Sequence, residues 1–318
     1  MSNPKVSIVI PVYNTEVFVE EAVRSIMDQT LRDTEIIIIN DGSTDTSLDI
    51  IQKLSEEDTR IQIYSQENQG LSATRNRGIA LASGRYIYFM DSDDYLEPKA
   101  LETCLDKCEK NNLDFVFFDA DILNKEHDFS INLTYDRDDY TDENELYNGI
   151  DLLNILLDNK CYTPSACLNF INLNHLRQTK NLFLPGIIHE DQLFTCILYL
   201  EARRIMRIND RFFKRRLRED SIMTRRFSRR NMDCYFIVSD HLLAYANDHP
   251  ITKATIDKYL FQMLDAAAWL SYRLPLKDRL YVASQYIRKY REFFCKFCQN
   301  RVIPLASLSI DHRWSEYD

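Results

Sequence analysis

Glycine is scarce in this chain of 318 residues: there are six, and none follows Gly186. The 132 residues after it therefore favour helix over turns that need a left-handed backbone. Long apolar runs are absent as well, because the longest, such as Tyr86–Met90, fall far short of the ~18 residues of a membrane-spanning helix. No basic leader precedes an apolar stretch at the amino terminus, which argues against a signal peptide.

Charge and cysteine content narrow the class of protein further. The eight cysteines read as reduced thiols of a cytoplasmic protein, because the chain is long and shows no export signal. The net charge of −10 argues against a surface that binds nucleic acid. The segment 203–230 departs from this average, with 12 basic and 3 acidic residues. It is typical either of a solvated face or of contact with anionic lipid at the inner face of the membrane, and both stay open.

Five short apolar, β-branched runs predict buried strands. They are Val6–Pro11, Glu35–Ile39, Ile61–Tyr64, Tyr86–Met90 and Asp114–Phe118. Residues with helical apolar spacing lie between them, so strand and helix alternate. This alternation predicts right-handed βαβ units and an α/β fold with a mostly parallel sheet flanked by helices on both faces.

We expect three regions along the chain. The strands and helices above occupy residues 1–123. A polar, acidic stretch then leads into a second part, residues 124–230. Residues 231–318 form a mainly helical carboxyl-terminal region, with three helices divided by Pro250 and Pro275.

Polar or aromatic residues follow three of the predicted strands, where ligands bind in open α/β sheets. Tyr13 follows the first strand and Asp41 the second, so Tyr13 could stack on a base while Asp41 accepts from a ring N–H. Asp91–Asp94 follows the fourth strand with an Asp-x-Asp pattern. Mg²⁺ and Mn²⁺ take one or two carboxylates and complete their shells with phosphate and water, so this turn suits either ion. The alternatives are a core tyrosine and a solvated acidic turn.

Four motifs in order resemble the family 2 glycosyltransferases of GT-A fold, over about the first 120 residues. The motifs are Val6–Asn14, Asn40–Asp45, Asn68–Ser72 with Arg75–Gly78, and Asp91–Asp94. The resemblance implies an inverting enzyme that uses a nucleotide-diphosphate sugar, commonly UDP-linked, and a divalent metal ion. The acceptor would be a hydroxyl of a glycan or of a lipid-linked oligosaccharide, as in cell-surface polysaccharide synthesis. Residues 1–123 would then bind the nucleotide sugar and residues 124–230 the acceptor.

The resemblance also implies a role for individual residues of the motifs. The implied roles are Pro11 and Tyr13 lining the base, Asp41 bonding the uracil, Arg75 near the nucleotide, Asp91 beside the ribose and Asp93 holding the metal. Asn40 stands where many relatives have a second aspartate. It changes little, because the position that matches the base contact is Asp41.

The segment Leu184–Phe194 is similar to the family's Glu-Asp motif, whose aspartate is the usual general base. An inverting transfer needs a carboxylate that takes the hydroxyl proton while the oxygen attacks the anomeric carbon. We therefore expect Asp191 to be the base and Glu190 to bind the acceptor. Both residues could also be first-turn acids stabilised by a helix dipole, and the two interpretations are compatible. His189 replaces an aromatic residue often seen there and receives no role.

The segment Phe213–Met223 resembles the strand and loop that follow the Glu-Asp helix in this family. A guanidinium group there would stabilise the charge that builds on the leaving diphosphate. We expect Arg218 to supply it.

The carboxyl-terminal region contains aromatic and basic residues together. Its mixture of aromatic and basic residues suits a membrane surface, a dimer interface or packing onto the catalytic domain.

The chain lacks the Gln-x-x-Arg-Trp motif of processive relatives, so we expect addition of a single sugar. Cys295 and Cys298 have no second pair in support, and we assign them no zinc site.

Two other functions compete with sugar transfer. A sugar nucleotidyltransferase would need a glycine-rich, basic phosphate loop, and the residues after the first predicted strand provide none. An inactive relative that only binds nucleotide sugar would not need Asp93 and Asp191, and both are present.

Overall fold

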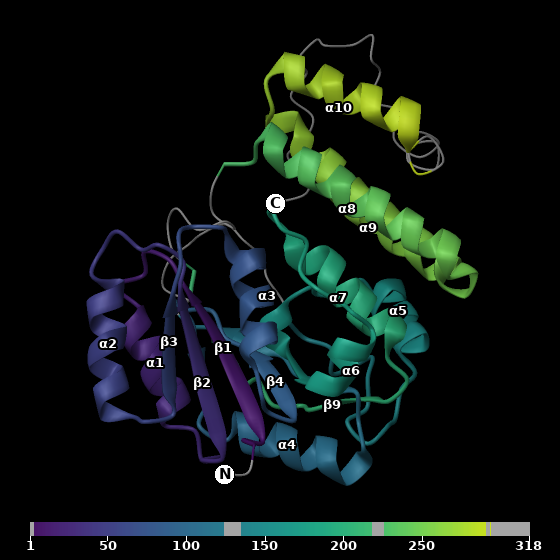
Figure 1. Cartoon of the computed structure of the whole chain (residues 1–318). Coiled ribbons are helices and arrows are strands. Elements are labelled where there is room, and N and C mark those ends of the chain that lie inside the picture. The colour runs from purple at the N-terminus through teal and green to yellow at the C-terminus, as the bar shows by residue number, and fades with distance from the viewer. Residues whose placement is uncertain (1–2, 124–134, 218–225, 291–292, 294–318) are drawn as a thin grey trace.

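A seven-stranded sheet forms the centre of the computed structural model, which describes residues 3–123, 135–217, 226–290 and 293. Its strands are β1 (Val6–Val12), β2 (Thr34–Asn40), β3 (Ile61–Ser65), β4 (Tyr86–Phe89), β6 (Phe115–Phe117), β8 (Asn169–Asn172) and β9 (Ile205–Arg207). Their order across the sheet is β3-β2-β1-β4-β8-β6-β9. Figure 1 labels β3, β2, β1, β4 and β9. All neighbouring pairs are parallel except those of β8, which is antiparallel to both β4 and β6. The expected α/β fold with a mostly parallel sheet is confirmed.

Helices cover both faces of this sheet. One face carries α1 (Val19–Met27), α2 (Ser47–Glu57) and α4 (Ala100–Asn111). The other carries α3 (Leu71–Leu81), α5 (Gly149–Asp158), α6 (Leu173–Gln178) and α7 (Glu190–Glu201). Within β1, Ile8 and Ile10 join the first core and Val9 joins the second, as the alternation of side chains along a strand requires. Because both faces are covered, β1 and β2 are apolar runs without polar alternation.

A second sheet of three short strands lies beside the first. Its strands are β5 (Tyr95–Leu96), β7 (Ala120–Ile122) and β10 (Phe213–Arg215). The central strand β10 is antiparallel to β5 and parallel to β7. The sequence did not predict β5 or β7, because two or three residues are too few to show a period. This small sheet brings the middle of the basic segment next to the turn Asp91–Asp94, which directly precedes β5.

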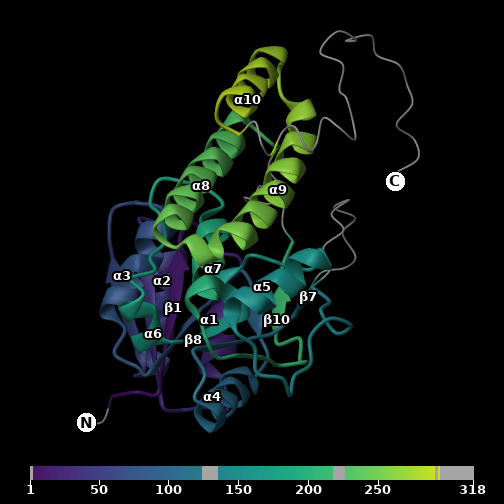
Figure 2. The same ribbon diagram turned by 90° about the vertical axis from the view of Figure 1, so that its right-hand side faces the viewer.

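The carboxyl-terminal region is helical, as expected. It contains α8 (Arg229–Asp248), α9 (Lys253–Leu270) and α10 (Leu276–Lys289). Helix α8 packs against α7 and α9 packs against α5, so these helices share a core with one face of the central sheet (Figure 2). Within the part of the chain that the structure describes, no helix combines the length and the apolar character needed to cross a bilayer. The region boundaries after residues 123 and 230 stay predictions.

Candidate active site

The predicted base-binding residues lie at or near the carboxyl ends of two neighbouring strands of the central sheet, β1 and β2. Val12 of β1 is paired with Asn40 of β2, and the backbone N–H of Asp41 donates to the Val12 carbonyl at 2.9 Å. The residues that follow, Tyr13 and Asp41, are therefore neighbours. Tyr13 is 50% exposed, whereas Pro11 is buried within the strand.

Asp41 anchors the loop that leads into α3. Its Oδ1 accepts from the Gln66 amide at 2.7 Å and from the Gln69 backbone N–H at 2.9 Å, and its Oδ2 accepts from the Gly70 N–H at 2.9 Å. A carboxylate has about four lone-pair sites, so these three bonds leave one for a further donor. Contact with a base stays a prediction for Asp41; its role in holding this loop was not expected.

Arg75 on α3 joins the two halves of the predicted site. Its Nη2 donates to Asp91 Oδ1 at 2.8 Å, and its Nη1 donates to Glu190 Oε1 at 2.9 Å and to Asp191 Oδ1 at 3.0 Å. The Arg75 side chain is only 1% exposed and also lies 5.1 Å from the centre of the Phe183 ring. One guanidinium thus binds the carboxylate that follows β4 and the two that begin α7. The sequence placed Arg75 near the nucleotide and did not reveal these partners.

A close approach between α3 and β1 allows this arrangement. A Cβ atom at Gly78 would lie 2.2 Å from a methyl group of Val9 in β1, so only glycine fits there. Gly78 is three residues after Arg75, on the same side of the helix. The tight contact therefore holds the helix that carries Arg75 close to the sheet.

The environment shifts the pKa values of the three carboxyl groups bound by Arg75 in different directions. Burial would raise the pKa of Asp91, but Arg75 and Arg215 outweigh it and hold that pKa below its usual value. Burial and the charge of Asp191 raise the pKa of Glu190 to about 7, against the effect of Arg75. Burial also raises the pKa of Asp191, with Arg75 opposing the shift. Asp191 is the more accessible of the last two, since its side chain is 23% exposed and that of Glu190 is 7% exposed.

His189 connects the start of α7 to the carboxyl-terminal helices. Its ring stacks on Tyr235 of α8 with centroids 4.6 Å apart, and its Nε2 lies 3.1 Å from the amide nitrogen of Asn231. Burial lowers the pKa of the His189 imidazole to about 4, so the ring is neutral and accepts a hydrogen bond from Asn231. His189 has no role predicted from the sequence, and nothing in the local pattern indicates a partner 42 residues away.

The basic segment reaches the acidic turn through Arg215 and Arg216. The Arg216 backbone N–H donates to Asp94 Oδ1 at 2.6 Å, and its Nε donates to the Asp93 carbonyl at 2.9 Å. Burial raises the pKa of Asp94 well above its usual value, although the charge of Arg215 lowers it. The residue assigned from the sequence, Arg218, lies outside the described residues. Arg215 and Arg216 were within the basic segment that the sequence singled out, but neither was chosen.

The turn Asp91–Asp94 has a donor set that fits a hard divalent cation. The charges of Asp93 and Asp91 both raise the pKa of Asp94, because the three carboxyl groups are close together. Asp91 is bound by Arg75 and Asp94 by the Arg216 backbone, while Asp93 is partly exposed beside them. Carboxylate oxygens are the ligands that Mg²⁺ and Mn²⁺ prefer. Asp93 as the metal ligand stays a prediction.

Another group of carboxylates, away from this turn, carries oxygen atoms within 4.8 Å of one another: Asp119, Asp136 and Asp138. Arginines already compensate these charges. Asp119 accepts from Arg137 and from Arg207, each at 2.6 Å. Asp138 also binds Arg207, and Asp136 binds a third arginine, Arg211, at 3.0 Å. We interpret this group as an ion-pair network, buried at Asp119 and exposed at Asp136 and Asp138, rather than a metal site.

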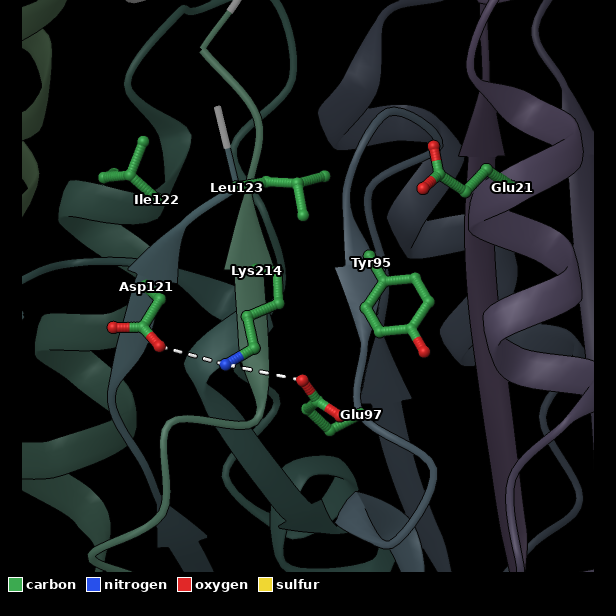
Figure 3. A pocket seen from close by; sticks show the side chains of 7 residues that line it. All are labelled: Glu21, Tyr95, Glu97, Asp121, Ile122, Leu123 and Lys214. Atoms are coloured by element: carbon green, nitrogen blue, oxygen red, sulfur yellow. Dashed lines mark hydrogen bonds and ion pairs between the residues drawn. The ribbon is translucent and has the colours of Figure 1, made fainter. Parts of the chain in front are cut away.

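A cavity of about 400 Å³ lies beside the small sheet (Figure 3). Lys214 spans its wall, with its Nζ 3.0 Å from Asp121 and 3.4 Å from Glu97. The lining residues are Glu21, Tyr95, Glu97, Asp121, Ile122, Leu123 and Lys214. None of them belongs to the site predicted from the sequence.

Comparisons with known proteins test the expected family and fold. Residues 7–168 match the model of glycosyl transferase family 2. A stretch of 113 residues is 45% identical to the uncharacterized glycosyltransferase EpsJ of Bacillus subtilis and covers 36% of this chain and 33% of that protein. A stretch of 221 residues is 31% identical to the glycosyltransferase GlyA of Streptococcus pneumoniae and covers 69% of this chain and 31% of that protein. The matched segments thus span about a third of the length of these two relatives.

Solved structures share the fold. The Staphylococcus aureus protein TarS, residues 1–349 in complex with UDP-GlcNAc, superposes with a TM-score of 0.64 at 20% identity over 94% of this chain and 93% of TarS. The mannosyltransferase PcManGT from Pyrobaculum calidifontis, in complex with GDP-Man and Mn²⁺, superposes with a TM-score of 0.58 at 14% identity over 94% of this chain and 80% of PcManGT. The family, the GT-A fold and the glycosyltransferase class expected for this domain are confirmed. The chain belongs to glycosyl transferase family 2.

Proposed function

We propose that this protein is an inverting glycosyltransferase that moves one sugar from a nucleotide-diphosphate sugar to a hydroxyl group of a glycan or a lipid-linked acceptor. The observation that carries the proposal is the Arg75 cluster. The guanidinium group of Arg75 binds both Asp91 and Asp191. Asp91 lies on the side predicted to bind the donor, and Asp191 lies on the side predicted to bind the acceptor. A sugar bound against these carboxyl groups would have Asp191 beside the acceptor hydroxyl that attacks its anomeric carbon.

The donor is a UDP-sugar in this proposal. Tyr13 offers a half-exposed ring on which a base can stack, Asp41 retains a lone pair for a ring N–H, and Asp91 is partly exposed beside them for the ribose. TarS, a structural neighbour, is described in complex with UDP-GlcNAc, which supports the same class of donor here. Asp93 would hold Mn²⁺ or Mg²⁺, which neutralises diphosphate charge when bound. Arg218 stays our proposed partner of the leaving diphosphate.

The reaction is a single displacement. The acceptor oxygen forms a bond to the anomeric carbon while the bond from that carbon to the β-phosphate oxygen breaks, and its electron pair leaves with the nucleotide diphosphate. The hydroxyl proton passes to the carboxylate of Asp191. Arg75 binds Asp191 Oδ1, so it fixes the orientation of the base and leaves the carboxylate with lone pairs for the proton. Glu190, buried beside it, would bind a second group of the acceptor.

A donor panel tests the proposal. The full chain is incubated with UDP-, GDP- and dTDP-sugars and Mn²⁺, and released nucleotide is measured. We expect metal-dependent release from one UDP-sugar and its loss in Asp191→Asn. Release of pyrophosphate from a sugar phosphate and a nucleoside triphosphate would instead establish a nucleotidyltransferase. Binding of a nucleotide sugar without turnover would establish an inactive relative.

We also propose a cytoplasmic location, with the protein peripheral at the inner face of the membrane. The described cysteines are all free thiols, which supports a reducing compartment. The basic segment supports contact with an anionic surface.

A further inference from the structure

The outer face of α10 exposes a stripe of large aliphatic side chains. Leu276, Leu280 and Ile287 are 49%, 55% and 52% exposed. They are spaced by four and seven residues, so they share one side of the helix. Figure 1 shows α10 as the outermost helix, at the end of the molecule opposite the amino terminus. We call this stripe and the exposed residues of the adjoining turn, residues 271–273, the α10 face.

The opposite side of α10 already has its partners. Val282 and Tyr286 are buried in the core that includes α8, and the Tyr286 hydroxyl donates to the Leu264 carbonyl of α9 at 2.6 Å. Tyr290, just after the helix, donates to Asp240 of α8 at 2.8 Å. The α10 face is therefore a second apolar surface on a helix whose opposite side already packs against described residues of α8 and α9.

Basic residues flank the stripe. Segment 271–289 contains five basic residues and one acidic residue, within a chain whose net charge is −10. Arg273, Lys277 and Arg288 are exposed, whereas the one acid, Asp278, lies 3.8 Å from Arg229 of α8, and Lys289 pairs with Asp240 of α8 at 3.0 Å. Trp269 at the end of α9 and Tyr272 in the turn before α10 add two half-exposed aromatic rings, with centroids 5.7 Å apart. Aliphatic, aromatic and basic side chains together are typical of a helix that lies in a membrane interface.

We infer that the α10 face binds the surface of an anionic lipid bilayer. Charge decides between a bilayer and a second copy of the chain as the occupant. Two copies would bring two positively charged segments together, which costs free energy, whereas anionic headgroups attract the basic residues while the aliphatic stripe enters the acyl boundary. This inference goes beyond the proposed reaction, because binding to lipid needs no sugar transfer.

Contacts connect this face to the predicted acceptor side of the site. Arg229, at the start of α8, lies 3.8 Å from the centre of the Tyr281 ring of α10. Two residues later, Asn231 contacts His189, which directly precedes Glu190 and Asp191. A bilayer bound at α10 would therefore be linked, through α8, to the residues predicted to bind the acceptor.

Vesicle binding tests the inference. The full chain is mixed with vesicles of phosphatidylcholine alone or of phosphatidylcholine and phosphatidylglycerol in about equal amounts, and bound protein is measured by flotation. We expect binding to the anionic vesicles that weakens with added salt and little binding to the neutral ones. Lys277→Glu with Arg288→Glu should weaken binding at least ~25-fold, since each basic residue contributes about fivefold. Leu280→Glu with Ile287→Glu should abolish it.

Matched controls carry the same substitutions elsewhere. Ile251→Glu changes an aliphatic residue that is 81% exposed at the other end of α9, and Lys53→Glu changes an exposed lysine of α2. Both should bind vesicles like the wild type. Thermal unfolding of every variant verifies that it folds, and donor hydrolysis without lipid verifies that the proposed reaction is unaffected.

Two results would overturn the inference. One is binding to anionic vesicles that the α10 variants leave unchanged. The other is a wild-type dimer in light scattering that Leu280→Glu dissociates, because the face would then join two copies of the chain. Failure of the donor panel with intact vesicle binding would count against the proposed reaction and not against the α10 face.

Discussion

Replacement of Arg75 by methionine should destabilise the protein in a pH-dependent way. Methionine keeps much of the side-chain volume but leaves Asp91, Glu190 and Asp191 without their shared cation. Removing one partner of a buried ion pair costs about 3–5 kcal/mol, and three acids here lose the same partner. We therefore expect a loss of at least ~3 kcal/mol in the free energy of unfolding at pH 8.

The sign of the pH effect follows from proton binding. Arg75 lowers the pKa of all three carboxyl groups, so its removal raises their pKa values in the folded state relative to the wild type. A folded state that binds more protons than the unfolded state gains stability as pH falls. The difference between Arg75→Met and the wild type should therefore be largest at pH 8 and shrink towards pH 5.

Denaturant unfolding at both pH values measures this difference. Arg85→Met is the matched control, because Arg85 forms an exposed ion pair with Glu109 at 3.1 Å. An exposed pair contributes about 0–1 kcal/mol, so this variant should differ little from the wild type at either pH. A loss below ~1 kcal/mol for Arg75→Met, or one equal at pH 5 and pH 8, would refute the view of Arg75 as the cation that stabilises the site.

Four further predictions concern single residues of the site. Asp191→Asn should lower kcat at least ~10²-fold with donor affinity retained in calorimetry, because general-base catalysis contributes about 10²–10⁴; survival of activity would mean that another residue is the base. Asp93→Ala should abolish the dependence of UDP affinity on Mn²⁺, and an unchanged dependence would contradict its assignment as ligand. Glu190 has a pKa raised to about 7, so wild-type stability should fall as pH rises from its ordinary value of 4.5 through 7, and Glu190→Gln should lack that part of the fall in unfolding experiments. His189→Ala should lower kcat by up to ~10²-fold with unchanged donor affinity, since a small misplacement of a catalytic group costs that much; a loss of donor affinity instead would count against a role on the acceptor side.

Much of the fold could be predicted from local patterns. The strands β1, β2 and β4 are buried on both faces, so each is an apolar run that needs no partner to be recognised. Long helices such as α8 and α9 likewise show their buried side in the spacing of apolar residues. Strand β8 could not be found in this way. It has four residues with only Phe170 and Ile171 apolar, and its antiparallel place between β4 and β6 depends on pairing with distant segments.

For the candidate site, too, local sequence determines some features and tertiary contacts determine others. The four motifs by themselves determined the family and the residues that follow each strand, because motif residues are close in sequence and their strands end at one edge of a parallel sheet. Only the tertiary structure decided what those residues contact. Arg75 is separated by 16 residues from Asp91 and by 116 from Asp191, and His189 by 42 from Asn231. Contacts between residues so far apart in the sequence form only when whole helices and strands pack together, so the local spacing of residues cannot predict them.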